Sequence, residues 1–503
     1  MFKNFTPSKG DGRNPGGSDS GALGLLLGNY AESSSAPLAE GDKAPLAEGE
    51  KRSSAWSKAD ALIERYALQI MARKAMLEEH YRKPQEDRPK RAHKVCACRR
   101  ELRPIEDGKG KLYKPAVFQH KQTGGTFYGG HIICGSSRAC PLCAQKIGQQ
   151  RADEIRTAVD AWMASGGLVL FVTLTFPHSA QDSLPDLLTS FKSALSVFRG
   201  GRSALKIRGE LGYSGLIRSM ETTWGRENGW HPHSHELWFI RPDGDLRASL
   251  VQAALESRQF FIKRGKRPPS PFGELFKIQK KLWERWKNAC LKSGLEEPSF
   301  ENGIRVEMAE NEEQTRSRLA EYLAKSGLEL DPSAPVWGAD DELVRVHSKR
   351  GKSGRFTPFD FLREQYNPET TKEDKARFRE LFSEFVASYR GMASVFWSPG
   401  LKASFKIAEL SDQESAEKQD QPSTKITDIH GHLWAFVIGI DDHRAQLLNR
   451  AAESGLSGVN AYLDDLLERY YLEHFQDGFM RLSFDARYLL SLPQDAFESL
   501  IEG

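Results

Sequence analysis

The sequence predicts an α+β protein, and three stretches of the chain support this prediction. The run "GLVLFVTLTF" at 167–176 is rich in Val, Leu, Phe and Thr and stops at Pro177, which is typical of a buried strand. The stretches "GLIRSMETTW" at 215–224 and "HSHELWFI" at 233–240 flank a loop that contains "GRENG", and they predict a β-hairpin. Helical segments interrupt these strands without a regular βαβ alternation, so we expect an α+β fold.

Helices are expected before and after these strands. Ser57 opens a long amphipathic helix with Asp60 three residues on as a weak capping box, and further helices are expected at about 275–293 and 309–326. The last 75 residues or so also look helical. Residues 1–54 hold Gly, Ser, Pro, charged residues and the repeat "APLAEGDK" then "APLAEGEK", so we expect a disordered tail.

Length and composition narrow the class of protein. A chain of 503 residues exceeds one ordinary domain, and its apolar fraction of 39% can support a core. We find no run of 18 apolar residues and no basic region before "GALGLLLG", so neither a membrane span nor a signal peptide is expected. Six cysteines in a chain of this length favour metal binding in a reducing cytoplasm over a secreted disulfide scaffold.

The net charge of +3 does not by itself indicate a binding partner, but the distribution of basic residues along the chain does. Three basic islands stand out in a balanced chain, at Arg82–Lys94, Lys263–Arg267 and Arg345–Arg355. Each one alone can be a solvated loop. Together they flank the motifs below and favour a polyanionic partner.

Three histidines alternate in "HPHSH", followed by an apolar run. Alternate side chains of a strand share a face, so His231, His233 and His235 should point the same way. The partner strand supplies a carboxylate, Glu221. Two imidazoles and one carboxylate with open positions suit a divalent ion that activates a phosphoryl oxygen, and a hydrolytic zinc site could use the same residues.

A candidate nucleophile lies downstream in "RLAEYLAKSG". Tyr322 and Lys325 are spaced i and i+3 and should share a helix face. Near a metal-polarised phosphate and an ammonium group, a phenol can attack phosphorus and form a phosphotyrosine bond. A Tyr-x-x-Lys pair by itself is usually structural, so this interpretation depends on the motifs around it.

Five cysteines are clustered as C-x-C, a gap, then C-x5-C-x2-C. Thiolates at Cys-x-x-Cys spacing can share one tetrahedral Zn²⁺, and one cysteine is in excess of the four ligands needed. His131 could also serve as a ligand, and reduced core cysteines without metal are the alternative. Cys290 stands apart and is expected to be a small buried hydrophobe.

The order "FVTLTFPH", "HPHSHELWF", "YLAK" resembles the three-motif signature of the HUH endonuclease superfamily. More closely, the chain is similar to replication initiator (Rep) proteins of rolling-circle plasmids. The element "CGSSRACPLCAQKIGQQR" and the downstream segments "GRFTPFDFL" and "FWSPGLKASF" strengthen the resemblance, which covers roughly residues 93–410. It implies an HUH domain with a central antiparallel sheet flanked by helices, preceded by a cysteine zinc module.

The resemblance also implies an activity and a set of site residues. Tyr322 would nick plasmid origin DNA at a single-stranded or hairpin site, forming a 5′-phosphotyrosine bond, and Lys325 would assist. His233, His235 and Glu221 would bind Mn²⁺ or Mg²⁺, with His231 in support. In the related proteins a single upstream cysteine precedes an extended segment. The expected structural zinc ligands are therefore Cys98, Cys134, Cys140 and Cys143, with Cys96 and His131 as substitutes.

The resemblance also bears on Thr173 and Thr175 of the first motif and on the position four residues before Tyr322. The threonines would line the adjacent strand, either in packing or in contact with DNA. Some related Reps carry a glutamate four residues before the tyrosine for termination; here Arg318 holds that position, and Glu321 lies about 100° around the helix. The termination residue is therefore unassigned.

The expected partners are origin DNA, a host helicase and a replicative DNA polymerase, in the cytoplasm of a bacterium. The chain has Gly-Lys-Ser at 351–353 but lacks the first glycine of a phosphate-binding loop, where Val346 stands, so unwinding would depend on the host helicase. The C-terminal region resembles a helix-turn-helix with Gly455 in the turn; a helical pair that packs on the body or dimerises is the alternative. The sequence gives no oligomeric state.

Other functions remain open from the sequence. A single-tyrosine HUH transposase or a relaxase would share the motifs, a non-catalytic zinc-containing origin-binding protein would not need the tyrosine, and a zinc hydrolase would not need DNA. The expected organisation is a tail at 1–54, a helix and basic linker at 55–92, a zinc module at 93–150, a nicking domain at 151–365, an extension at 366–410, a linker at 411–428 and a helical region at 429–503.

Overall fold

The computed structural model describes residues 58–105, 111–264, 268–308, 354–418, 422–439 and 442–474. All of them lie in one compact unit that spans Arg52–Gly503. The helices are α2 (Lys58–Arg82), η1 (Lys94–Cys96, a 3₁₀ turn), α3 (Pro141–Ala164), α4 (Leu184–Arg199), α5 (Gly201–Glu210), α6 (Gly244–Arg264), α7 (Gly273–Lys292), α8 (Phe300–Gly303), α11 (Pro358–Arg363), α12 (Lys372–Ser388), α13 (Leu401–Ser404), α14 (Asp412–Glu417), α15 (Gly431–Val437) and α16 (Arg444–His474).

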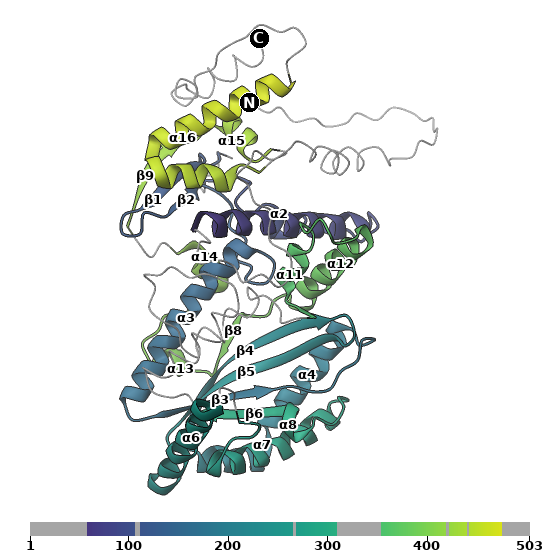
Figure 1. The fold of residues 1–503 in the computed structure, drawn as a ribbon, viewed down its shortest axis with the longest axis vertical. Coiled ribbons are helices and arrows are strands. Elements are labelled where there is room, and N and C mark those ends of the chain that lie inside the picture. The colour runs from purple at the N-terminus through teal and green to yellow at the C-terminus, as the bar shows by residue number, and fades with distance from the viewer. Residues whose placement is uncertain are drawn as a thin grey trace. The chain divides into compact units, whose positions relative to one another are not determined.

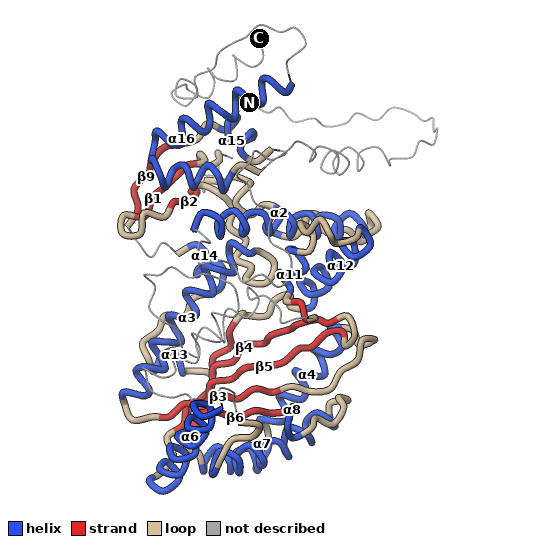
Figure 2. The backbone as a smooth tube through the Cα atoms, viewed as in Figure 1, coloured by secondary structure: helices blue, strands red, loops and turns tan. Residues whose placement is uncertain are grey.

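The strands form two sheets that are antiparallel throughout (Figures 1 and 2). The larger sheet has the order β6-β3-β5-β4-β7, and β8 also pairs with β4. The smaller sheet has the order β2-β1-β9. The strands are β1 (Ala116–His120), β2 (Thr126–Gly129), β3 (Leu168–Leu174), β4 (Tyr213–Gly225), β5 (Gly229–Ile240), β6 (Ile304–Met308), β7 (Arg355–Phe356), β8 (Val395–Trp397) and β9 (Ser423–Asp428).

The larger sheet separates two hydrophobic clusters because side chains alternate between its faces. On one face Ile217 of β4 and Leu237 of β5 pack with Ile155 of α3 and Leu401 of α13. On the other face Trp238 of β5 belongs to the main core, which includes residues of α4 and α7. The sheet is therefore covered on both sides, and its strands are rigidly placed.

The smaller sheet is joined to the C-terminal helices. The Tyr128 hydroxyl of β2 donates to the carbonyl of Arg444 at 2.9 Å, and the Thr126 hydroxyl donates to the carbonyl of Leu448 at 2.7 Å. The Trp434 indole of α15 donates to the carbonyl of Arg100 at 2.9 Å. The segment around the cysteines and the C-terminal helices thus pack as neighbours.

The structure confirms the mixed α+β fold and the main strand predictions. The buried strand appears as β3, and the predicted hairpin appears as β4 and β5, with β5 starting four residues earlier than expected. The helices expected from Ser57 and at 275–293 appear as α2 and α7. The helix expected at 309–326 lies outside the described residues.

The polar segment at 411–428, which the sequence predicts to be a linker, contains a helix and a strand. It contains α14, which begins with a capping box between Ser411 and Glu414, and β9, which pairs with β1. β9 lies at the edge of its sheet and none of its side chains is buried, so its backbone pairing does not require an apolar sequence. The predicted domain boundaries stay predictions; the one at residue 150 falls inside α3.

Gly455 interrupts the C-terminal helix, as predicted. Its backbone is non-helical, with φ 56° and ψ −135°, so α16 is two helical pieces joined at this residue. The part before it packs on the body, through Ala445, Leu448 and Ala451 in the main core. Among the described residues, no helix is both long enough and apolar enough to cross a membrane.

Candidate metal centres

The β4–β5 hairpin brings Glu221 and two histidines together. Glu221 lies directly opposite His233 in the antiparallel register, and His235 follows two residues along the same face. The hairpin is long, with thirteen residues in β4 and twelve in β5, and it is held on either side by β3 and β8. The three side chains therefore extend from a fixed backbone.

One carboxylate oxygen sits between two imidazoles. Glu221 Oε2 is 3.2 Å from His233 Nε2 and 3.2 Å from His235 Nε2, and all three ligand atoms lie within 4.8 Å of one another. Burial alone would raise the pKa of Glu221, but the charge of His233 and hydrogen bonds from both histidines lower it well below its usual range. The carboxylate is therefore an anion ready to bind a cation.

The other ring nitrogens set the orientation of both imidazoles. His233 Nδ1 donates to the carbonyl oxygen of its neighbour His231 at 3.2 Å. His235 Nδ1 lies 3.1 Å from the hydroxyl oxygen of Thr173, which stands opposite His235 in the β3–β5 register. Both Nε2 atoms face Glu221, so the nitrogens that contact this carboxylate also point to the place where a cation would bind. Thr173 thus orients a candidate ligand, a contact that the sequence did not reveal.

This donor set fits a divalent ion. Two imidazole nitrogens and one carboxylate oxygen suit the ions of the first transition row and leave further positions for water or a substrate oxygen. Glu221 and His235 are almost buried, at 9% and 8% exposure, whereas His233 is partly exposed. Access to the group is therefore possible from the side of His233.

His231 is held by a histidine of the first motif and stands outside this group. His178 Nδ1 donates to the carbonyl of Asn228 at 2.8 Å, and His178 Nε2 lies 2.7 Å from His231 Nδ1. Burial, followed by the charges of His233 and His178, lowers the pKa of His231 to about 2, so the ring is neutral. His178 Nε2 therefore accepts the proton of His231 Nδ1, and the pair is fixed beside the candidate ligands.

The remaining residues of the predicted nicking site lie outside the described residues. These are Tyr322, Lys325 and the neighbouring Arg318 and Glu321. Two of the three basic islands also lie partly there. In the remaining island, Arg82–Lys94, most side chains are exposed.

Four cysteines form the second cluster, and they are the four that the resemblance implied. Cys98, Cys134, Cys140 and Cys143 are buried, and their sulfur atoms lie within 4.8 Å of one another. Three of the Sγ–Sγ distances are 3.6, 3.7 and 3.8 Å. Four ligands at Zn–S bonds of about 2.3 Å in a tetrahedron would stand about 3.8 Å apart. The arrangement thus matches a structural zinc site, and all six cysteines are free of disulfide bonds.

The cysteine cluster is built at the start of a helix. Cys140 is the N-cap residue of α3 and Pro141 follows at its first turn, so Cys140 and Cys143 lie where the helix dipole favours thiolates. Hydrogen bonds from the other three cysteines lower the pKa of Cys143 well below its usual range. From outside, Gln69 of α2 donates to the carbonyl of Cys98 at 2.8 Å.

Cys96 and His131, the alternative zinc ligands, and the isolated Cys290 lie outside the four-cysteine cluster. Cys96 points away from the cluster and its thiol lies 3.9 Å from the carbonyl of Arg73. His131 is buried between the rings of Tyr128 and Trp434, with centroid distances of 5.8 and 4.4 Å. Cys290 is fully buried in the core of α7, as expected.

The fold and these two clusters define a mixed α+β protein with two groups suited to metal ions. The chain is a distant homologue of proteins named "Protein rep". It is 27% identical over 311 residues to that of Streptomyces lividans, covering 54% of this chain and 63% of the relative. It is 28% identical over 156 residues to that of Lentilactobacillus hilgardii, covering 30% of this chain and 43% of the relative. This homology confirms the resemblance to Rep proteins that the motifs predicted.

A third relative carries a different name. The chain is 29% identical over 148 residues to a "Neomycin resistance protein" of Streptomyces cyanogenus, covering 25% of this chain and 34% of the relative. The chain thus spans less than two thirds of the length of each of these curated relatives. No protein-family model matches the chain, and no solved structure matches it significantly.

Proposed function

We propose that this protein is an HUH-type initiator that nicks one strand of plasmid origin DNA and so starts rolling-circle replication. The observation that carries the proposal is the group of Glu221, His233 and His235, with the Nε2 atoms of both histidines turned toward one carboxylate oxygen. The distant homology to two proteins named "Protein rep" supports replication as the setting.

In the proposed reaction Tyr322 is the nucleophile. Its phenolic oxygen forms a bond to phosphorus and releases its proton to solvent, while the bond from phosphorus to the 3′ oxygen of the preceding nucleotide breaks. That oxygen takes up a proton and becomes the 3′ hydroxyl that primes synthesis, and the 5′ phosphate stays on the tyrosine. Lys325 stabilises the phenolate or the phosphate charge.

The residues of β4 and β5 would position the scissile phosphate. His233, His235 and Glu221 would hold Mn²⁺ or Mg²⁺, and the bound ion would polarise a phosphoryl oxygen. Thr173 keeps the ring of His235 in the orientation that binding needs. His178 and His231 support the same face of the hairpin.

The remaining parts of the proposal concern architecture and partners. The cysteine cluster would hold a structural Zn²⁺ that braces the segment before α3. The nicking domain would extend over 151–365, after a zinc module at 93–150, and the partners would be origin DNA, a host helicase and a host DNA polymerase in a bacterial cytoplasm.

The decisive experiment is detection of the covalent intermediate. The full chain is incubated with single-stranded origin DNA that is labelled at its 3′ end, on the fragment that stays on the tyrosine, together with Mn²⁺ or Mg²⁺, and the mixture is run on a denaturing gel. We expect a slow, protease-sensitive DNA–protein band that vanishes in Tyr322→Phe and persists in Tyr81→Phe, which alters an exposed tyrosine of α2. Absence of the band from folded, metal-loaded protein with every origin-proximal substrate would favour a non-catalytic origin-binding protein.

A further inference from the structure

A row of charged and aromatic side chains crosses the face of the larger sheet that lies opposite the histidines. In the register of β4, Arg218 stands between Phe396 of β8 and Glu236 of β5. Glu221 lies three residues further along β4 and therefore on the other face. Leu216 and Trp238, neighbours of the row, belong to the main core, so the face is that of α4 and α7.

The only carboxylate in this row is already occupied. Glu236 is fully buried; its Oε1 pairs with the guanidinium of Arg199 at the end of α4, and its Oε2 accepts from the Trp238 indole at 2.7 Å. Among the described residues, the guanidinium of Arg218 makes no hydrogen bond. It lies instead over the ring of Phe396, 4.8 Å from the centroid.

Arg218 therefore has no hydrogen-bonded carboxylate partner among the described residues, although the charge of Glu236 acts on it. Burial, together with the positive charge of Arg199, lowers its pKa to about 10, so it remains protonated at neutral pH. Nε of Arg199 is also buried without a partner among the described residues. The guanidinium of Arg218 thus keeps free N–H donors, and guanidinium N–H groups bind phosphate oxygens.

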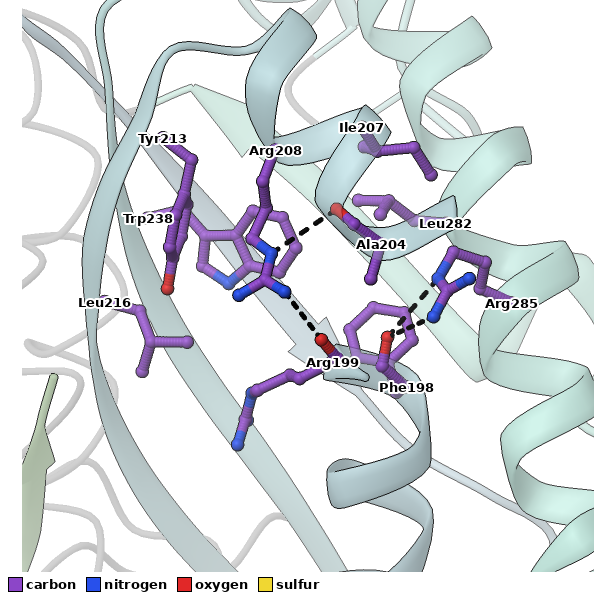
Figure 3. Close-up of a pocket in the computed structure, with 10 residues that line it drawn as sticks. All are labelled: Phe198, Arg199, Ala204, Ile207, Arg208, Tyr213, Leu216, Trp238, Leu282 and Arg285. Carbon is purple, nitrogen blue, oxygen red and sulfur yellow. Dashed lines mark hydrogen bonds between the residues drawn. The ribbon is translucent and has the colours of Figure 1, made fainter. Parts of the chain in front are cut away.

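Beyond Arg199 the row continues into a small pocket that holds two more arginines (Figure 3). Arg208 donates to the carbonyls of Ala204 and Arg199, and Arg285 donates to the carbonyl of Phe198. Both guanidiniums bind backbone carbonyl groups of α4 and α5 and have no carboxylate partner among the described residues. They add positive charge to this face without being neutralised.

An aromatic ring is exposed at the edge of this basic row. Phe396 belongs to a three-residue strand and is 42% exposed, which is unusual for a ring in a sheet. A free guanidinium beside an exposed ring matches one nucleotide of a single strand, with its phosphate and its unpaired base. A duplex would not fit in the same way, because its bases are covered by their pairing and stacking.

We propose that Arg218, Arg199 and Phe396 form a subsite for one nucleotide of single-stranded DNA, on the face of the sheet opposite Glu221, His233 and His235. The phosphate binds the guanidinium of Arg218 with help from Arg199, and the base stacks on Phe396. Arg218 and Glu221 are three residues apart on one strand, about 10 Å along it, so one DNA strand that passes around the sheet edge reaches both. The subsite rests on the proposed function, since it holds the strand whose phosphate is cut.

The test measures separately what the charge of Arg218 and the ring of Phe396 contribute to DNA binding. Binding of a fluorescein-labelled single-stranded 20-mer, without origin sequence and without added Mn²⁺ or Mg²⁺, is followed by anisotropy over a range of salt concentrations. We expect Arg218→Gln to weaken binding about tenfold at low salt and to reduce the slope of log affinity against log salt by about 0.7, the value for one phosphate contact. We expect Phe396→Ala to weaken binding about tenfold and to leave this slope unchanged.

Matched controls exclude a general effect on charge or folding. Arg202→Gln removes an exposed arginine of α5, and Phe276→Ala removes a ring of α7 that is 39% exposed; both should bind like the wild type. Arg218→Lys should keep the salt slope, and each variant should unfold near the wild-type temperature. A blunt-ended duplex should be insensitive to Phe396→Ala.

Wild-type affinity and slope in both Arg218→Gln and Phe396→Ala would overturn the subsite, even if the covalent band forms. Conversely, the predicted losses in a protein that forms no covalent band would support the subsite and contradict only the nicking reaction. Loss of duplex and single-strand binding to the same extent in Phe396→Ala would also overturn it, because stacking requires an unpaired base.

Discussion

The four-cysteine cluster and the group of Glu221, His233 and His235 both bring ligand atoms within 4.8 Å, but they differ in how far they are closed. The cysteines supply four ligands, and Cys98, Cys140 and Cys143 have no exposed surface. The second group supplies three ligands, and His233 is partly exposed. A closed set of four thiolates is typical of a structural zinc ion, whereas an incomplete set leaves a position for a substrate. The two groups therefore suit different tasks.

The two groups also differ in the secondary structure that carries their ligands. The cysteines come from loops and from the first turn of α3, and a bound ion would fix parts of the chain that have little other regular structure. The carboxylate and the histidines extend from paired strands in the middle of a covered sheet. We therefore expect loss of the first site to damage the fold and loss of the second to damage the reaction alone.

The largest effect is expected from Cys140→Ser. One ligand of the closed cluster is lost, and structural zinc binding by small domains is worth about 10–16 kcal/mol, so the zinc should be released and the free energy of unfolding should fall by several kcal/mol. Zinc content and thermal unfolding measure this. Cys96→Ser, outside the cluster, is the control and should keep the metal. Full zinc content in Cys140→Ser would contradict the assignment.

The next effect is expected from His235→Ala, which should leave the fold intact. Removal of a ligand that a bound divalent ion needs should slow formation of the covalent DNA–protein band about a thousandfold, equivalent to about 4 kcal/mol. Single-turnover nicking measures the rate, and thermal unfolding should change little. A rate within tenfold of the wild type would show that the group is not the reaction site.

A smaller effect is expected from Thr173→Val, which removes the hydroxyl that faces His235 Nδ1. Loss of such an orienting contact typically lowers metal affinity or activity by about 10–100-fold. Titration of Mn²⁺ by calorimetry measures it. Thr175→Val is the matched control, because the hydroxyl of Thr175 donates to the carbonyl of Asn302 and not to a ligand. Equal losses in both variants would point to packing of β3.

The smallest effect is expected from His231→Asn. His231 bonds to His178 and stands outside the group of three, so Mn²⁺ affinity should fall by less than about tenfold. The same calorimetric titration decides the outcome. A loss of Mn²⁺ affinity as large as that of His235→Ala would mean that the site uses four ligands from the chain. The two groups would then not differ in the number of ligands.

The hairpin and its three candidate ligands could be predicted because the evidence is local. Alternation in "HPHSHELWFI" fixes which side chains share a face, and a short loop places Glu221 on the neighbouring strand. The contact between Thr173 and His235 could not be predicted, because it depends on the register between strands that are 62 residues apart. No local pattern encodes that register.

The cysteine cluster and β9 also depend on residues that are far apart in the sequence, so local patterns predict them only in part. Spacing indicated a zinc site with one cysteine too many, and only the resemblance favoured Cys98 over Cys96, a choice that the geometry of the buried cluster supports. The sequence predicts a linker where β9 lies, because an edge strand with exposed side chains needs no apolar pattern. Its partner β1 lies far away in the sequence, where periodicity gives no information.

The pairing of β9 with β1 also has a consequence for synthesis of the chain (Figure 1). About 300 residues separate the two strands, and at ribosomal rates of about 5–20 residues per second β1 stays without this neighbour for roughly 15–60 s. During that time the nascent chain has an open sheet edge, which can pair with other chains. Ribosome-stalled chains that end before Ser423 should therefore depend more on chaperones than the finished protein does.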